Sequence, residues 1–255
     1  MRKRKNIPTV DKSYCHIYQS PIFGSTIEID FVEPKVCPFD CGYCPFGTTT
    51  RRIIDLIDGP EAEDVIRDLQ RILPIAPLPE YLLLSGKGDP VIYKELGSLI
   101  EKIREVTKIP IAVITSGGVL WRQDVQHELA HVDAVLSILD SPDKMKYHQI
   151  NRPLDVVPFD RYLNGLVQFS HVFHGNFWLH TTLVSNMNTI DSDIELLARE
   201  IDLIKCQRVF LRSVGYKEGK AIAPPLESAK LHEFAHRFGT DVVVREKPSQ
   251  PKGGK

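Results

Sequence analysis

The stretch VCPFDCGYCP, residues 36–45, decides how the rest of the chain is interpreted. Cys37, Cys41 and Cys44 place three thiols within eight residues, at the spacing C-x3-C-x2-C. A [4Fe–4S] cluster is usually held by four thiolates, so a set of three leaves one iron open to another ligand. An open coordination position is where a metal centre does chemistry. The stretch therefore predicts an enzyme.

On spacing alone, two other interpretations of these cysteines remain open. One is a zinc knuckle completed by Cys15 or His16, and the other is a chance grouping. Five cysteines, three of them clustered, do not resemble the disulfide framework of a secreted protein. We therefore expect a reducing, cytoplasmic location, which a labile cluster also requires.

Length and composition describe an ordinary globular protein. With 255 residues the chain is long enough for one α/β barrel, and 42% of it is hydrophobic and 25% charged. The net charge of −1 provides no overall field that attracts nucleic acid. No apolar run approaches the ~18 residues of a membrane-spanning helix, and nothing resembling a signal peptide follows the basic residues 2–5, so no membrane association is expected.

Short β-rich runs alternate with longer amphipathic runs. The expected strands are 26–32, 81–84, 111–114, 134–139, 177–184 and 208–211, and the expected helices are 61–73, 92–106, 121–129, 159–169, 191–204 and 226–238. Six βα units in order predict a parallel sheet with right-handed crossovers. Too few strands remain to close eight, so we expect a partial (β/α)6 TIM-type barrel.

We expect three segments along the chain: an N-terminal extension (1–21), the barrel (22–240), and a C-terminal strand and flexible tail (241–255), with 241–244 a candidate late edge strand. In such barrels the loops at the C-terminal ends of the strands hold the active site. The cysteine loop follows the first expected strand and therefore falls on that face. This placement favours an active-site cluster over a zinc knuckle.

The cysteine spacing, with Tyr43 directly before the last cysteine, resembles the signature of the radical S-adenosylmethionine (SAM) superfamily. The resemblance implies that Cys37, Cys41 and Cys44 bind three irons of a single [4Fe–4S] cluster while SAM chelates the fourth. It further implies that the reduced cluster splits SAM into methionine and a 5′-deoxyadenosyl radical, which abstracts hydrogen from an unidentified substrate. An external low-potential donor, flavodoxin or ferredoxin, would reduce the cluster.

The resemblance extends to residues expected to contact SAM. The turn at 85–89 resembles the family's glycine-rich stretch that receives the amino group of SAM, and relatives carry Glu where this chain has Asp89, so Asp89→Glu is expected to be tolerated. The expected cofactor-binding residues are Tyr43, Ser85, Gly86, Gly88, Asp89, Ser116, Asp140 and Arg152. Ser116 stands in a turn similar to the family's Thr-Asn-Gly, Asp140 in a stretch near the SAM ribose, and Arg152 or Arg212 can pair with a carboxylate or phosphate.

His180 lies on an expected strand, where relatives place a polar residue that looks into the barrel. Two interpretations of His180 remain open: it is a structural histidine, or it contacts the substrate.

Stretches 31–37, 81–90, 150–153 and 183–188 are together similar to a wyosine-synthetase-like branch of the superfamily. Wyosine synthetases carry a second cluster on three further cysteines, whereas this chain has only Cys15 and Cys206 beyond the first three. We therefore expect that it does not form the wyosine tricycle, and tRNA is a possible but not favoured substrate. The alternatives are a glycyl-radical-activating enzyme, a zinc-stabilised nucleic-acid-binding module, and a non-catalytic sensor that binds SAM or a cluster.

Overall fold

The computed structural model describes residues 13–217, 219–221 and 223–245. Its main sheet has eight strands in the order β1-β2-β5-β6-β7-β8-β9-β12. These are β1 (Cys15–Ser20), β2 (Gly24–Ile29), β5 (Tyr81–Leu84), β6 (Ile111–Thr115), β7 (Ala134–Ile138), β8 (Asn176–Val184), β9 (Arg208–Val214) and β12 (Asp241–Arg245). Every neighbouring pair from β2 to β12 is parallel, and β1 runs antiparallel to β2. The predicted partial barrel of parallel strands is confirmed.

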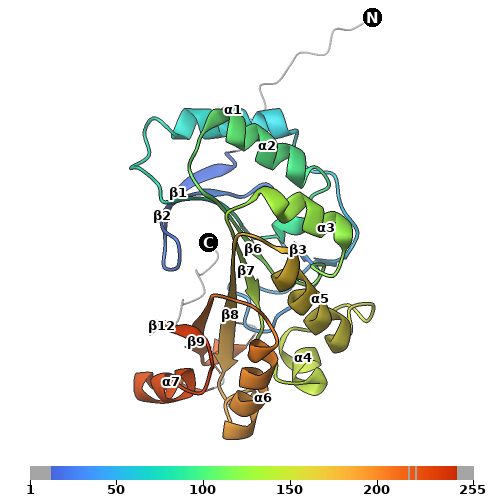
Figure 1. Ribbon diagram of the computed structural model, residues 1–255, viewed down its shortest axis with the longest axis vertical. Helices are drawn as coiled ribbons and strands as arrows, with labels where there is room; N and C mark the ends of the chain where they lie inside the picture. Colours follow the sequence, from blue (N-terminus) through green and yellow to red (C-terminus); the bar gives the residue numbers. More distant parts are fainter. Residues whose placement is uncertain (1–12, 218, 222, 246–255) are drawn as a thin grey trace, which may run out of the picture.

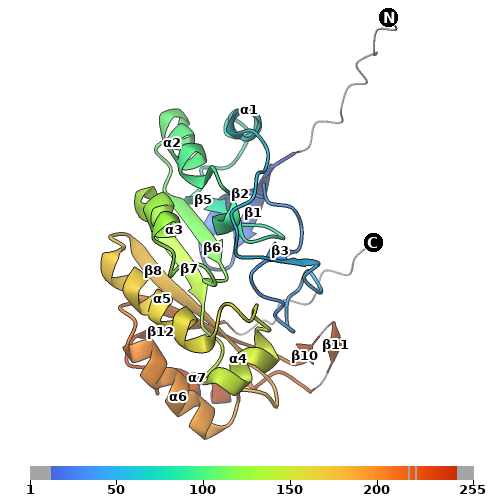
Figure 2. The same cartoon turned by 90° about the vertical axis from the view of Figure 1, so that its right-hand side faces the viewer.

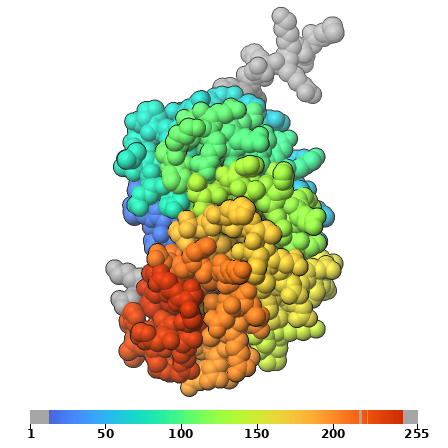
Figure 3. Space-filling model, viewed as in Figure 1, coloured from blue at the N-terminus to red at the C-terminus, as the bar shows by residue number. Residues whose placement is uncertain are grey.

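Helices cover one face of this sheet (Figures 1 and 2). They are α1 (Ala62–Ile72), α2 (Leu96–Val106), α3 (Gln123–Glu128), α4 (Lys144–Ile150), α5 (Phe159–Val172), α6 (Asp191–Asp202) and α7 (Ser228–Ala235), with 3-10 turns at Pro90–Ile92 and Leu129–His131. Figure 3 shows this helical face, with the helices of the N-terminal half toward one end of the long axis and those of the C-terminal half toward the other. No helix in the described residues is long and apolar enough to cross a bilayer.

Strand alternation divides the buried side chains between the two faces of the sheet. Leu82 and Leu84 belong to the large core that includes the helices, whereas Leu83 belongs to a smaller cluster. That smaller cluster lines the other, concave face and includes Phe23, Leu136 and Phe210. Successive side chains of a strand point to opposite faces, so one run of leucines supplies both clusters.

The structure differs from the sequence-based expectation at the N-terminal side of the barrel. Residues 15–20, expected within an extension, form the edge strand β1, and Asp68 on α1 accepts hydrogen bonds from the backbone amides of Tyr14 (2.6 Å) and Cys15 (2.9 Å). The first expected strand ends at Ile29 rather than Val32. An edge strand anchored by a carboxylate from a distant helix leaves little local signal in the sequence.

Three further parts of the structure also depart from expectation. The helix expected from residue 92 begins at Leu96, because Asp89 caps the short turn Pro90–Ile92 and the chain extends again at Tyr93. Helix α4 was not expected; its first turn is capped by the Asp143 carboxylate, which accepts from the amide of Lys146 (2.9 Å). At the far edge, β12 pairs parallel with β9, which confirms the candidate late strand. The small hairpin of β10 (Tyr216–Lys217) and β11 (Lys220–Ala221) was also not expected.

Candidate active site

The three cysteines lie on a loop that is closed at its base by a two-stranded pair. Strand β3 (Val36–Cys37) pairs with β4 (Arg51–Arg52), and the Thr49 amide donates to the Asp40 carboxylate (2.6 Å). The loop is tied to the turn after β5, because the Asp89 amide donates to the Val36 carbonyl (2.9 Å). It is also tied to the end of α4, where the Gly42 amide donates to the Ile150 carbonyl (2.9 Å). The loop therefore sits at the C-terminal ends of the strands, as predicted.

Two of the sulfur atoms receive hydrogen bonds from side chains. The Lys35 ammonium donates to Cys44 Sγ (3.1 Å), and the Asn151 amide donates to Cys41 Sγ (3.5 Å). Burial raises the pKa of the Cys37 thiol well above its ordinary value and that of Cys41 to about 12. A bound iron holds such thiols as thiolates, and donors to the sulfurs tune the cluster they ligate.

The donor set fits a three-thiolate cluster. All three thiols are free and half-buried on one closed loop. Among the described residues, no three His, Cys, Asp or Glu side chains gather around a single metal ion. The thiolates of a [4Fe–4S] cluster each bind a different iron, so they need not converge on one point.

Asp89 and Ser116 lie beside Cys37. The buried Asp89 carboxylate accepts from the Ser116 amide (3.0 Å) and hydroxyl (2.5 Å), from the Thr115 hydroxyl (3.2 Å), and from the Val91 amide (3.4 Å). Burial nevertheless raises the pKa of Asp89. Its negative charge contributes, after burial, to the raised pKa of Cys37. These contacts lock the ends of β5 and β6 together next to the cysteine loop.

The glycines of the 85–89 turn are required by protein packing. A Cβ on Gly86 would lie 2.1 Å from Asp30 Oδ1, and Gly86 has φ +149°. A Cβ on Gly88 would lie 2.6 Å from the Glu33 carbonyl oxygen. The Ser85 hydroxyl donates to Glu28 Oε1 (2.6 Å). The turn therefore packs closely on β2 and the segment after it, and this packing explains the glycines without a ligand.

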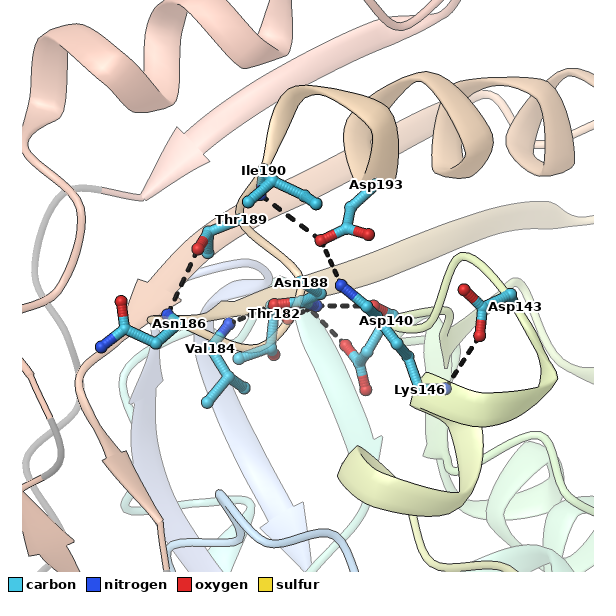
Figure 4. A network of polar contacts seen from close by, with 10 residues as sticks. All are labelled: Asp140, Asp143, Lys146, Thr182, Val184, Asn186, Asn188, Thr189, Ile190 and Asp193. Atoms are coloured by element: carbon cyan, nitrogen blue, oxygen red, sulfur yellow. Dashed lines mark hydrogen bonds and ion pairs between the residues drawn. The ribbon is translucent and has the colours of Figure 1, made fainter.

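Asp140 joins the cysteine loop to β8. Its carboxylate accepts from the Tyr43 hydroxyl, the Asn151 amide (2.8 Å) and the Thr182 backbone amide (2.7 Å). Its backbone carbonyl accepts from Asn188 (2.6 Å), which also bonds Thr182 (Figure 4). Burial raises the pKa of Asp140 despite these donors. The hydrogen bonds of the Asp140 carboxylate thus hold Tyr43 and β8 in place.

Arg152 and His180 occupy different surroundings. Arg152, in the left-handed backbone region (φ 47°), lies 3.6 Å from the Asp40 carboxylate of the cysteine loop. His180 is on the concave face of β8, where its Nε2 is buried and has no hydrogen-bond partner within the described ranges. Burial, with the nearby charges of Arg212 and Arg245, lowers the pKa of His180 well below its ordinary value. The lowered pKa favours the neutral imidazole.

The fold brings most of the predicted site residues together around the cysteine loop. Those joined to it by the contacts above are Tyr43, Asp89, Ser116, Asp140 and Arg152, whereas His180 stands apart on the concave face. The sequence did not single out Lys35, Asn151 and Asn188 as contacts of this site. All three fall within stretches 31–37, 150–153 and 183–188, so that similarity was the available signal. Arg245, whose charge adds to burial in lowering the pKa of His180, lies outside these three stretches.

Comparison with known proteins assigns the family. Residues 34–201 match the family model for the radical SAM superfamily, and the chain belongs to that superfamily. A Brachyspira hyodysenteriae protein named GTPase Obg is 30% identical over 221 residues, covering 87% of this chain but 32% of that protein. The chain thus spans about a third of that relative, and it contains no G-x-x-x-x-G-K-[ST] phosphate loop.

Solved structures share the fold. A radical SAM methyltransferase from Sphaerobacter thermophilus has a TM-score of 0.67 and 16% identity, covering 93% of this chain and 70% of that one. TYW1, a wyosine synthetase solved with a lysine-pyruvate adduct bound, has a TM-score of 0.62 and 17% identity, covering 83% and 72%. Membership in the superfamily implies a [4Fe–4S] cluster, SAM and an external reductant.

Proposed function

We propose that this protein is a radical SAM enzyme that holds one [4Fe–4S] cluster through Cys37, Cys41 and Cys44 and cleaves SAM reductively. The observation that carries the proposal is the closed loop at the strand ends, which presents three thiols, two of them with side-chain donors to sulfur. When bound, the reduced cluster and SAM supply a 5′-deoxyadenosyl radical that abstracts hydrogen from a substrate.

The chain's own residues position this centre and keep water from it. Tyr43 and Asp140 fix the loop against β8, and Asp89 with Ser116 fixes the adjoining turns. Tyr43, Asp89 and Asp140 are buried. A rigid, dry surround suits a site that must confine a radical to one hydrogen of the substrate. We propose that Ser85 and the backbone of Gly86 and Gly88 accept hydrogen bonds from the SAM amino group.

A single cluster is supported by the positions of the other two cysteines. Cys15 is buried on β1, where its amide donates to Asp68, and Cys206 is half-buried after α6. They lie on separate elements and number only two, so they do not supply the three cysteines of an auxiliary site. We therefore propose that the wyosine tricycle is not a product and that tRNA is not the favoured substrate. As a separate proposal, flavodoxin or ferredoxin is the reductant of the cluster.

Anaerobic reconstitution of the full chain tests the proposal. The brown protein should hold about four irons per chain, and with SAM and dithionite it should release 5′-deoxyadenosine and methionine, measured by liquid chromatography and mass spectrometry. Cys41→Ala should abolish both cluster and product, whereas the matched control Cys206→Ala should retain them.

Other outcomes point to the alternatives. SAM binding without 5′-deoxyadenosine indicates a sensor, and zinc in place of iron indicates a zinc module. A large protein that co-purifies and gains a glycyl radical identifies an activating enzyme.

A further inference from the structure

Three adjacent strands place an imidazole and two guanidinium groups on the same concave face of the sheet. Thr182 of β8 is in register with Arg212 of β9, which is in register with Arg245 of β12. His180 shares its face with Thr182, because alternate residues of a strand point the same way. The face is fixed by Trp178, two residues earlier, whose ring contacts that of Phe210 (5.7 Å between centroids) in the concave cluster.

Arg212 connects this face to the cysteine loop. It is 7% exposed, its Nε donates to the Thr182 hydroxyl (3.1 Å), and its guanidinium lies 5.5 Å from the centre of the Tyr43 ring. Tyr43 directly precedes Cys44. A ligand held by Arg212 therefore lies on the side of the barrel that faces the cysteine loop.

Among the residues that the structure describes, Arg245 and His180 lack the partners that buried polar groups normally have. Within the described part of the chain, no carboxylate forms an ion pair with the half-buried Arg245. Burial and the charge of Arg212 lower the pKa of Arg245. In the same part of the chain, the buried His180 Nε2 has no hydrogen-bond partner. Burying positive charge next to positive charge is costly unless an anion joins them.

We propose that Arg212, Arg245 and His180 bind an oxyanion group, a carboxylate or a phosphate, of the substrate on which the radical acts. This inference rests on the proposed function and adds the chemical class of the substrate. Guanidinium groups present forked N–H donors that match such oxygens, and a neutral imidazole contributes one further N–H. Bound there, the anionic group would orient the substrate while its remaining atoms extend along the concave face.

The test uses the full, cluster-loaded chain with succinate and inorganic phosphate as separate probes and uncharged succinamide as a blank. Trp178, on the same face as His180, reports binding by its fluorescence, and calorimetry confirms it. We expect saturable binding of at least one anion and none of succinamide. Arg245→Gln should weaken that binding about tenfold, by loss of a charge-assisted contact, and Arg245→Lys less.

Arg208→Gln is the matched control, because Arg208 lies on β9 but is exposed and paired with Asp241 (2.6 Å). It should leave anion binding unchanged, and circular dichroism should show all variants folded. Preference for succinate identifies a carboxylate substrate, and preference for phosphate a phosphorylated one. The inference is overturned if neither anion binds, or if Arg245→Gln and Arg208→Gln behave alike.

The two proposals can fail separately. SAM cleavage is assayed in parallel without any anion. If the wild-type protein binds anions through Arg245 yet releases no 5′-deoxyadenosine, the proposed function falls and the oxyanion site stands.

Discussion

Two groups of buried polar side chains meet in this barrel, and they are satisfied in opposite ways. At the ends of β5 and β7, Asp89 and Asp140 direct their carboxylates at protein donors. On β8 and β12, within the described residues, the His180 Nε2 has no hydrogen-bond partner and Arg245 forms no ion pair. Fully bonded groups hold a scaffold rigid, whereas polar groups left unsatisfied are typical of places where a ligand completes the structure. The carboxylate side should therefore govern stability and the basic side binding.

The largest effect is expected from Asp140→Asn. The carboxylate accepts hydrogen bonds from Tyr43, Asn151 and Thr182, whereas the amide of asparagine has only one acceptor oxygen. Its NH2 group would also face these hydrogen-bond donors instead of an acceptor. Leaving buried donors unpaired should lower the free energy of unfolding by about 2–4 kcal/mol. Urea denaturation measures this loss, and iron content after reconstitution should fall with it. The exposed control Asp155→Asn should change stability by less than about 0.5 kcal/mol. Equal stability of the two variants would contradict the scaffold role of Asp140.

A smaller loss is expected from Asp89→Glu, although the family resemblance predicts that glutamate is tolerated. Asp89 is 3% exposed and bonded at both oxygens, so an added methylene must displace Ser116 or Val91. Overpacking of this kind should lower the free energy of unfolding by about 1–3 kcal/mol. Thermal unfolding followed by circular dichroism measures it, with Asp58→Glu as the exposed control. An unchanged melting temperature would show that the pocket adapts to glutamate, as the resemblance suggests.

On the basic side, His180→Leu should leave stability at pH 7.5 no lower than in the wild type, because it removes an unsatisfied buried nitrogen. The pH dependence should also change. The folded-state pKa of His180 lies well below its ordinary value of 6.5, so protons bind the unfolded state and stability is lost as pH falls below 6.5. Wild type should therefore lose about 1.4 kcal/mol more than His180→Leu between pH 7.5 and 5.5. Parallel denaturation curves at the two pH values test this, and identical losses would show that the pKa of His180 is the same in the folded and the unfolded chain.

The smallest effect is expected from Arg152→Gln. Its ion pair with Asp40 is long (3.6 Å) and partly exposed, so stability should fall by less than about 1 kcal/mol. The Michaelis constant for SAM gives a second measurement, with Arg67→Gln, another ion-paired arginine, as control. An increase of about tenfold, the loss of one charge-assisted contact, would place Arg152 in contact with SAM as the sequence suggests. No increase would assign it to the cysteine loop alone.

Much of the fold was predictable because its signals are local. Short apolar runs identified β2, β5, β6, β7, β8, β9 and β12 of the main sheet, and helical spacing at Val65 and Leu69 identified α1. Strand β1 and helix α4 were not predicted. The first depends on Asp68, far along the chain, and the second is a short helix whose capping residue, Asp143, is equally common in turns.

For the site, the features readable without a structure were three thiols at a fixed spacing, a glycine-rich turn, and an order of strands that puts both at one end of a barrel. The contacts of the other polar residues follow from the packing of the folded chain. Tyr43 and Asp140 are 97 residues apart in the chain and Cys41 and Asn151 are 110 apart, yet each pair is hydrogen-bonded. Arg212 and Arg245 become neighbours only because β12 pairs with β9. Spacing within a loop is fixed by covalent geometry, whereas the burial and partners that assign a carboxylate to scaffold or an arginine to ligand binding arise only when distant strands pack together.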